Sequence, residues 1–203
     1  KLEYSGSRAD RRVRRYVPPV RLVQAAPEVQ NAEILTGKVV EQSFLHFNPE
    51  ICTIPPGASI VLDYGIELHG GIRIVTGADS HAVIPVEVSF GESVSEALGR
   101  PVNDHAVHIG MVDLPPMGMA EVGNTAFRFV RITVPAGAAH PVELMGVPAV
   151  ALYLDLPYVG SFRSSDERLN RIWEVGAYTV HLNMQDYIYD GVKRDRFVWM
   201  GDL

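Results

Sequence analysis

Short apolar runs separated by turn residues dominate the chain from about residue 33 to residue 156. A strand with one buried face alternates apolar and polar side chains, as Val86, Val88 and Phe90 do with Glu87 and Ser89 between them. Several such runs, closely spaced, are typical of an antiparallel β-sandwich. The sequence therefore predicts a mainly β fold, with strands over 34–40, 59–64, 72–75, 82–90, 127–134 and 149–156.

Glycine and proline mark the turns between these runs. The chain holds 18 glycines and 14 prolines, spread from end to end rather than clustered. Ile54-Pro55-Pro56-Gly57 precedes one predicted strand, and Gly70-Gly71 lies between two others. Since glycine adopts positive φ at little cost, the Gly70-Gly71 pair predicts a hairpin.

The pattern changes after Pro157, where apolar residues recur at steps of three and four. This spacing predicts an amphipathic helix over about 166–185, with Ser164 and Glu167 forming a capping box at its start. The apolar stripe consists of Leu169, Ile172, Trp173, Gly176 and Val180. Such a stripe needs a cover, and because nothing after it predicts a partner helix, we expect the chain to be cut short.

Charge is uneven along the chain, whose formal total is −6. Seven lysines and arginines fall within the first 21 residues, against Glu3 and Asp10. Aromatic residues are sparse in this basic stretch, and the acidic body that follows would repel phosphate. We therefore expect a solvated lead-in segment and no nucleic-acid partner.

Composition leaves the cellular compartment open. Cys52 is the single cysteine, so an internal disulfide is excluded. The sequence has no apolar stretch of membrane-spanning length and no leader-type apolar core at its start, so we expect no membrane association. The protein is then cytoplasmic, or periplasmic or extracellular if a signal peptide was removed.

His105 and His108 are the one candidate metal pair, and Gly65 to Gly71 is the one glycine-rich stretch. The histidines lack a helical spacing and a third ligand, so strand or loop positions are favoured. No Lys-Ser or Lys-Thr pair follows the glycines, which argues against a phosphate-binding loop. We expect neither a metal nor a cofactor.

The last residues, 190–202, form what we call the closing segment. It holds three carboxylates, three cations and one tryptophan. By composition alone, alternating lysine, arginine and aspartate is typical of a solvated surface loop. The order of these residues gives a different interpretation.

The closing segment resembles the stretch near the start of the (α/α)6-barrel domain of bacterial α-L-rhamnosidases. In that family an acidic residue, an Arg-Glu pair and a Trp-x-Gly-Asp motif follow one another at the same spacing. The matching positions here are Asp190, Arg194, Asp195, Trp199, Gly201 and Asp202. Residues 160–173 also resemble the family's entry into its first barrel helix, and 61–67 and 129–132 resemble its last sandwich.

The resemblance implies inverting hydrolysis of terminal α-L-rhamnosyl residues, a reaction that needs a carboxylic acid and an opposing carboxylate. Asp195 would be the general acid, although the family commonly has glutamate at this position. Asp190 and Asp202 would bind sugar hydroxyls, and Trp199 would offer an apolar platform. Arg194 and Arg196 would orient the carboxylates. The partners implied are a rhamnose-containing carbohydrate and a downstream catalytic domain that supplies the second carboxylate.

Three parts of the chain are thus expected: a lead-in segment over 1–32, a β-sandwich domain over 33–157, and the first helix and active-site loop of an (α/α)6 barrel over 158–203. The rival hypothesis is a non-catalytic carbohydrate-binding or domain-interface β-sandwich module, because sandwiches often present sugars or neighbouring domains with a surface.

Overall fold

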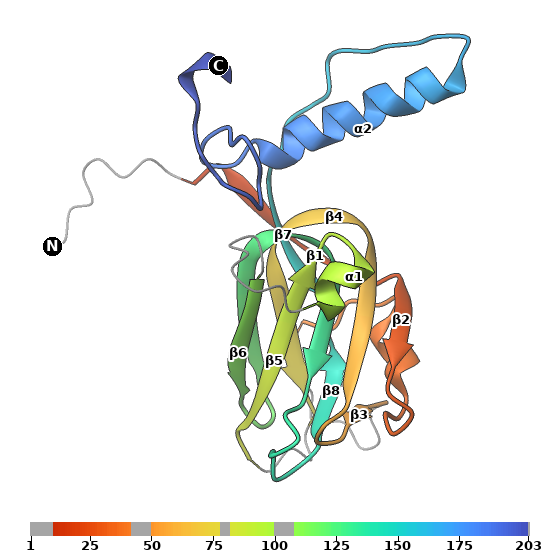
Figure 1. Ribbon diagram of the computed structural model, residues 1–203, viewed down its shortest axis with the longest axis vertical. Helices are drawn as coiled ribbons and strands as arrows, with labels where there is room; N and C mark the ends of the chain where they lie inside the picture. Colours follow the sequence, from red (N-terminus) through yellow and green to blue (C-terminus); the bar gives the residue numbers. More distant parts are fainter. Residues whose placement is uncertain (1–9, 42–49, 78–81, 100–107, 203) are drawn as a thin grey trace, which may run out of the picture. The chain divides into compact units, whose positions relative to one another are not determined.

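The computed structural model describes residues 10–41, 50–77, 82–99 and 108–202, apart from the side chain of Asp202. Two compact units divide the chain, one over Arg15–Ala151 and the other made of the residues up to Arg14 together with those from Leu152 onward. The elements, labelled in Figure 1, are β1 (Arg12–Val17), β2 (Arg21–Ala25), η1 (Ala32–Leu35), β3 (Cys52–Ile54), β4 (Ser59–Thr76), β5 (Ile84–Gly91), α1 (Val94–Leu98), β6 (His108–Leu114), β7 (Met119–Thr133), β8 (Val142–Gly146), β9 (Ala149–Leu154), α2 (Glu167–Asn183) and η2 (Met200–Asp202).

The described strands join into one sheet with the order β1-β9-β4-β7-β5-β6, and β2, β3 and β8 attach beside this path. Every strand pairing with an assigned register is antiparallel. The predicted mainly β fold is therefore confirmed. No helix in the described ranges has the length and apolar character needed to cross a bilayer.

Strand β4 organises the sheet because it is paired along both edges. One edge follows β7 from Ser59 to Val75, while the other meets β2, then β9, then β8. The pairing with β7 breaks register between Asp63 and Leu68, where Gly65 has φ +85°. Gly65 therefore marks a bend that lets a single strand serve successive parts of the sheet.

A buried carboxylate lies at this bend. Asp63 is 1% exposed and bonds the guanidinium groups of Arg21 and Arg128, each at 2.8 Å. It also accepts the backbone N–H of Gly65 at 2.8 Å. Burial alone would raise the pKa of Asp63, but these hydrogen bonds outweigh it and hold the pKa at about 2. The charge thereby links β2, β4 and β7.

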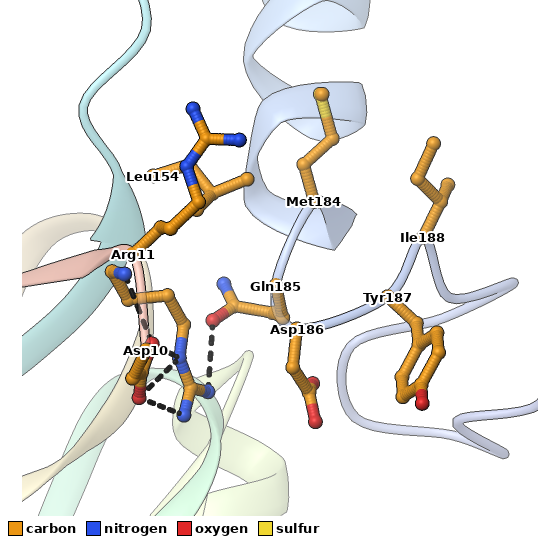
Figure 2. Close-up of a pocket in the computed structure, with 9 residues that line it drawn as sticks. Asp10, Arg11, Leu154, Met184, Gln185, Asp186, Tyr187 and Ile188 are labelled. Atoms are coloured by element: carbon orange, nitrogen blue, oxygen red, sulfur yellow. Dashed lines mark hydrogen bonds and ion pairs between the residues drawn. The ribbon is translucent and has the colours of Figure 1, made fainter. Parts of the chain in front are cut away.

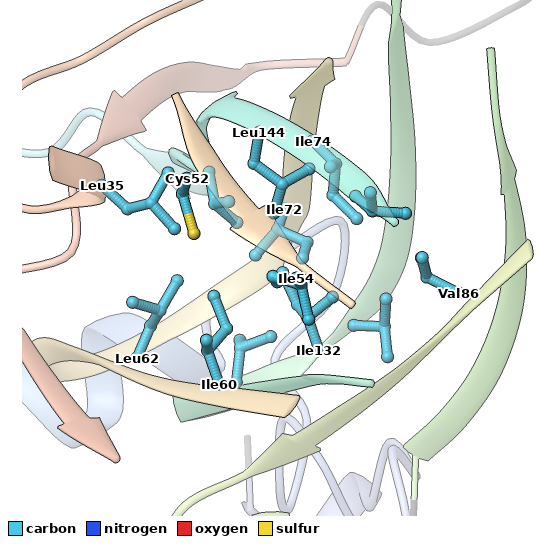
Figure 3. Packing of buried hydrophobic residues seen from close by; sticks show 14 of the residues in the cluster. Leu35, Cys52, Ile54, Ile60, Leu62, Ile72, Ile74, Val86, Ile132 and Leu144 are labelled. Carbon is cyan, nitrogen blue, oxygen red and sulfur yellow. The ribbon is translucent and has the colours of Figure 1, made fainter. Parts of the chain in front are cut away.

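The apolar core is lined by β-strand side chains, many of them β-branched (Figure 3). Phe127 meets the rings of Tyr64 and Phe90 edge to face, at centroid distances of 5.5 and 5.0 Å. The Tyr64 hydroxyl donates to the carbonyl of Val147 at 2.8 Å, which satisfies both buried polar groups. Cys52 is fully buried in this core, and burial raises the pKa of its thiol to about 12.

Two predictions about local structure were wrong. Residues 34–40 form no strand: η1 ends at Leu35, and Gly37, with φ +73°, donates its N–H to the carbonyl of Pro19. Gly70-Gly71 forms no hairpin either, because β4 runs straight through it. The glycines mark a register shift against β7, where the backbones come too close for a side chain.

Replacing Gly71 by alanine should destabilise the unit over Arg15–Ala151. The added Cβ would collide with the carbonyl oxygen of Val122 and lie 2.6 Å from that of Gly123. Both obstacles are backbone, so we expect a loss of about 1–3 kcal/mol in the free energy of unfolding, measured in urea. Gly110→Ala in β6 is the matched control, since its Cβ would meet nothing within 4 Å. Equal effects of the two changes would contradict this account of Gly71.

Candidate functional site

Helix α2 leads into the closing segment, and Asp166 caps its start. The Asp166 carboxylate accepts the backbone N–H of Arg168 at 2.8 Å. The predicted capping box of Ser164 and Glu167 is therefore wrong: the Ser164 hydroxyl accepts from the Asp166 N–H at 3.2 Å instead. Asn170 ties the approach to the helix, bonding the backbone N–H and carbonyl of Ser164 at 2.7 and 3.1 Å.

The C-terminal half of α2 is fastened by His181. Its Nε2 lies 2.6 Å from the carbonyl of Leu154, and its Nδ1 lies 2.9 Å from the hydroxyl of Tyr158. A carbonyl only accepts, so Nε2 carries the proton and, in the neutral ring, Nδ1 accepts from Tyr158. Tyr153 and Tyr158 also meet the imidazole edge to face. The helix is thereby joined to the stretch that follows β9.

One face of α2 stays open within the described part of the chain. Four apolar side chains on it are between 45 and 59% exposed: Leu169, Ile172, Val175 and Val180. Three of them belong to the stripe that the sequence predicts, so the amphipathic character is present without a cover among the described residues.

A pocket of about 410 Å³ lies where residues 10–12 approach residues 184–188, and Leu154 also lines it (Figure 2). Arg12 holds this pocket together: it bonds the Asp10 carboxylate at 2.8 Å and reaches the amide oxygen of Gln185 at 3.5 Å. The Gln185 side chain is buried and donates to the carbonyls of Leu152 and Leu182. Sequence reasoning missed the pocket because the first residues were assigned to a solvated lead-in.

The ends of the closing segment are joined through Asp190. One carboxylate oxygen accepts the backbone N–H groups of Gly191 and Phe197, at 2.7 and 2.9 Å. The other accepts the indole N–H of Trp199 at 3.0 Å, and the Asp190 N–H donates to the Phe197 carbonyl at 3.0 Å. The bond from Trp199, with those from the two backbone amides, lowers the pKa of Asp190. A loop of ten residues is thus closed on its first side chain.

Asp195 lies inside this loop as an ion pair with Arg194, whose Nε is 3.2 Å from its carboxylate. Arg194 is 59% exposed, so its guanidinium remains accessible to solvent. The next residue, Arg196, points differently: its Nε donates to the carbonyl of Val192 at 2.9 Å, and burial lowers its pKa. Arg194 therefore contacts Asp195 in the described geometry.

Four of the predicted site residues lie in contact in pairs. Asp190 meets Trp199, and Arg194 meets Asp195, all within the closing segment. The Asp202 side chain lies outside the described residues. So does His105, while His108 falls in β6 of the other compact unit. Among described side chains no group of three or more histidines, cysteines or carboxylates could hold a metal ion.

Comparison with known proteins gives the same family as the motif. Residues 157–203 match the model of the bacterial alpha-L-rhamnosidase 6 hairpin glycosidase domain. A solved rhamnosidase from Klebsiella oxytoca with rhamnose bound superposes with a TM-score of 0.71 and 20% identity, over 95% of this chain and 39% of that one. No curated protein sequence gave a match.

Two further solved structures are similar. One is a GH78 family rhamnosidase of Bacillus sp. GL1, with a TM-score of 0.55 and 21% identity over 83% of this chain and 17% of that one. The other is an alpha-L-rhamnosidase from Dictyoglumus thermophilum. Its TM-score is 0.54 and its sequence identity 22%, over 77% of this chain and 19% of that one. Such identities show a shared fold, and the chain spans about two fifths or less of each of these proteins. The resemblance predicted from the motif is confirmed.

Replacing Gly191 by alanine should open the closing segment. A Cβ at this position would collide with the carbonyl oxygen of Arg194, which is backbone and cannot rotate away. We expect faster amide hydrogen exchange at Phe197, whose N–H is held by Asp190. Gly201→Ala is the matched control, because an added Cβ there meets nothing within 4 Å. Unchanged exchange at Phe197 in the Gly191 variant would show that this close approach does not shape the loop.

Proposed function

We propose, from the match of residues 157–203 to the bacterial alpha-L-rhamnosidase 6 hairpin glycosidase domain, that the chain is the N-terminal part of an inverting α-L-rhamnosidase. Its substrate would be a terminal α-L-rhamnosyl residue of a glycoside or polysaccharide. The observation that carries the proposal is that the matched region contains a loop with a solvent-accessible carboxylate, Asp195. The resemblance of the motif assigns Asp195 to the position of the family's acid.

The proposed reaction divides its proton transfers between two carboxyl groups. Asp195 in its acid form donates a proton to the glycosidic oxygen as the bond from that oxygen to the anomeric carbon breaks. A water molecule attacks the anomeric carbon from the opposite face, and the second carboxylate accepts its proton. Inversion requires about 6.5–9.5 Å between the two groups, so that the water fits between them. The second carboxylate would come from the downstream catalytic domain.

Arg194 sets a condition on this role. The Arg194 guanidinium contacts the carboxylate of Asp195, which must reach the glycosidic oxygen of the substrate in the proposed reaction. Since Arg194 is largely exposed, its side chain can turn toward solvent or toward the opposing carboxylate without disturbing the loop backbone. We propose that substrate binding separates the pair and that Arg194 then orients the second carboxyl group.

The sugar would be positioned by side chains near Asp195 in the sequence. Trp199 is 56% exposed, so one side of its indole is available for the apolar face of a rhamnosyl ring. Asp202, three residues later, would accept hydrogen bonds from sugar hydroxyls.

We also propose the domain limits that the sequence predicts. A lead-in segment ends near residue 32, a β-sandwich ends near residue 157, and the opening of the barrel follows.

Asp195→Asn in the full-length protein tests the acid role. Asparagine keeps the shape of the side chain but has no proton to give, so turnover of substrates with poor leaving groups should fall by roughly 10² to 10⁴. Activated aryl rhamnosides, whose leaving groups need little protonation, should lose much less. Steady-state kinetics on both substrate types measure the difference.

Asp186→Asn is the control for this comparison, since Asp186 bonds the hydroxyl of Tyr189 and has no part in the proposed chemistry. An equal loss on both substrate types in the Asp195 variant would remove Asp195 from the acid role. Rhamnoside binding without any turnover by the unmutated full-length protein would instead favour a non-catalytic carbohydrate-binding module.

The 203-residue chain by itself should not hydrolyse aryl rhamnosides. It would supply Asp195 without an opposing carboxylate and without an enclosing barrel to exclude water. An assay of the purified chain beside the full-length protein measures this directly. Turnover by the chain at a rate typical of enzymes would overturn the division of the two carboxyl groups.

A further inference from the structure

The pocket of Figure 2 is lined by two carboxylates and two guanidinium groups, and three of these four groups already have partners. Arg12 donates to the Asp10 carboxylate from Nη2 at 2.8 Å and from Nε at 3.0 Å, and these bonds hold the pKa of Asp10 at about 2. The Asp186 carboxylate accepts the hydroxyl of Tyr189 at 2.7 Å. Arg11 is exposed and, within the described ranges, makes no hydrogen bond or ion pair. Its N–H donors are therefore available to a ligand.

The walls of this pocket suit a sugar ring. The volume of about 410 Å³ falls in the range of small-molecule sites, roughly 300–1,000 Å³. Leu154, Met184 and Ile188 supply apolar surface for the C–H groups of the ring. Gln185 is 3% exposed and its amide nitrogen is bound to two backbone carbonyls, so this wall is fixed before a ligand arrives. Because a guanidinium and a carboxylate can form two parallel N–H···O bonds, Arg11 makes the pocket best suited to a sugar that carries a carboxylate.

The pocket adjoins the loop that carries the proposed acid. Only Tyr189 separates residues 184–188, which form one wall, from the start of the closing segment. Burial lowers the pKa of Arg196, and the charges of Tyr189 and Asp186 oppose this effect, so Arg196 lies near both. Arg196 directly follows Asp195 in the sequence. A pocket in this place can receive the unit on the far side of the glycosidic oxygen that Asp195 would protonate.

We propose that the pocket binds the sugar unit to which the rhamnosyl group is attached, and that this unit is a uronic acid whose carboxylate pairs with Arg11. This inference rests on the proposed function, since it needs the rhamnosyl group to lie at Asp195. The rhamnosyl group carries no charge, so selectivity for an acidic substrate has to come from contacts with the neighbouring unit. Arg11 lies outside residues 157–203, the region that matches the family model, so the match does not supply this property.

Calorimetric titration of the full-length protein tests the site without turnover. D-galacturonate is the probe and D-galactose its uncharged counterpart, because the two differ in carrying a carboxylate or a hydroxymethyl group. Arg11→Gln should weaken the binding of D-galacturonate by about tenfold or more, and D-galactose should bind the unmutated protein correspondingly less well. Arg15→Gln is the matched control and should change nothing, since Arg15 is exposed on β1 and does not line the pocket.

Three calorimetric results would overturn the proposal. The first is equal binding of the two sugars, and the second is D-galacturonate binding that is undetectable or unaffected by Arg11→Gln. The third is an equal loss in the Arg11 and Arg15 variants, which would mean that the general charge of the N-terminal stretch attracts the anion and not the pocket.

Steady-state kinetics with two disaccharides place the site in the reaction. One has α-L-rhamnose attached to D-galacturonate, and the other has it attached to D-galactose through the same linkage. Arg11→Gln should lower kcat/KM about tenfold on the acidic disaccharide and less than about twofold on the neutral one. An equal loss on both would mean that Arg11 supports the fold and would overturn the proposal. If Asp195→Asn instead removes Asp195 from the acid role, only the proposed reaction fails, because Arg11-dependent binding of D-galacturonate is measured without it.

Discussion

The pairing of β4 along both of its edges is the constraint on which the sandwich unit depends. A strand with neighbours on either side exposes no backbone edge, and most of β4 is also buried, so its inward-facing polar side chains need partners there. That requirement explains Asp63, whose charge would be costly at this depth without Arg21 and Arg128. It also explains Gly71, where the approach of β7 leaves no room for a Cβ. The bend at Gly65, the ion pairs of Asp63 and the close approach at Gly71 therefore all follow from the way β4 is paired.

The sequence predicted the elements whose patterns follow a single period. β5 alternates between buried and more accessible positions as far as Val88, although Ser89 is buried as well. α2 repeats its apolar residues at helical steps, and both elements were predicted within a few residues of their bounds. β1 and β2 were missed because their arginines made this stretch look like a charged, solvated segment and not like strands. β4 was divided at Gly70 because a glycine pair has the same appearance in a turn and in a strand bulge. Only the neighbouring strand distinguishes the two, and its position depends on tertiary structure.

In the candidate site, too, features that are local in sequence were predicted and features that depend on the backbone path were not. Spacing was enough to single out Asp190, Asp195 and Trp199, because the motif is local in sequence. The hydrogen bonds of Asp190 were not predictable, since they depend on how the backbone turns between the two ends of the loop, including positive φ at Arg196. Several hydrogen bonds within residues 190–199 hold the two ends of the loop together.

Cys52 gives the molecule a built-in reporter. It is the single thiol in the sequence, it has no exposed surface, and its raised pKa leaves almost no thiolate at neutral pH. A thiol reagent in solution can therefore react with it at an appreciable rate only when β3 has left its place beside β8. The rate of chemical modification at this one sulfur would then record how often the β-sheet opens around Cys52, without any engineered label.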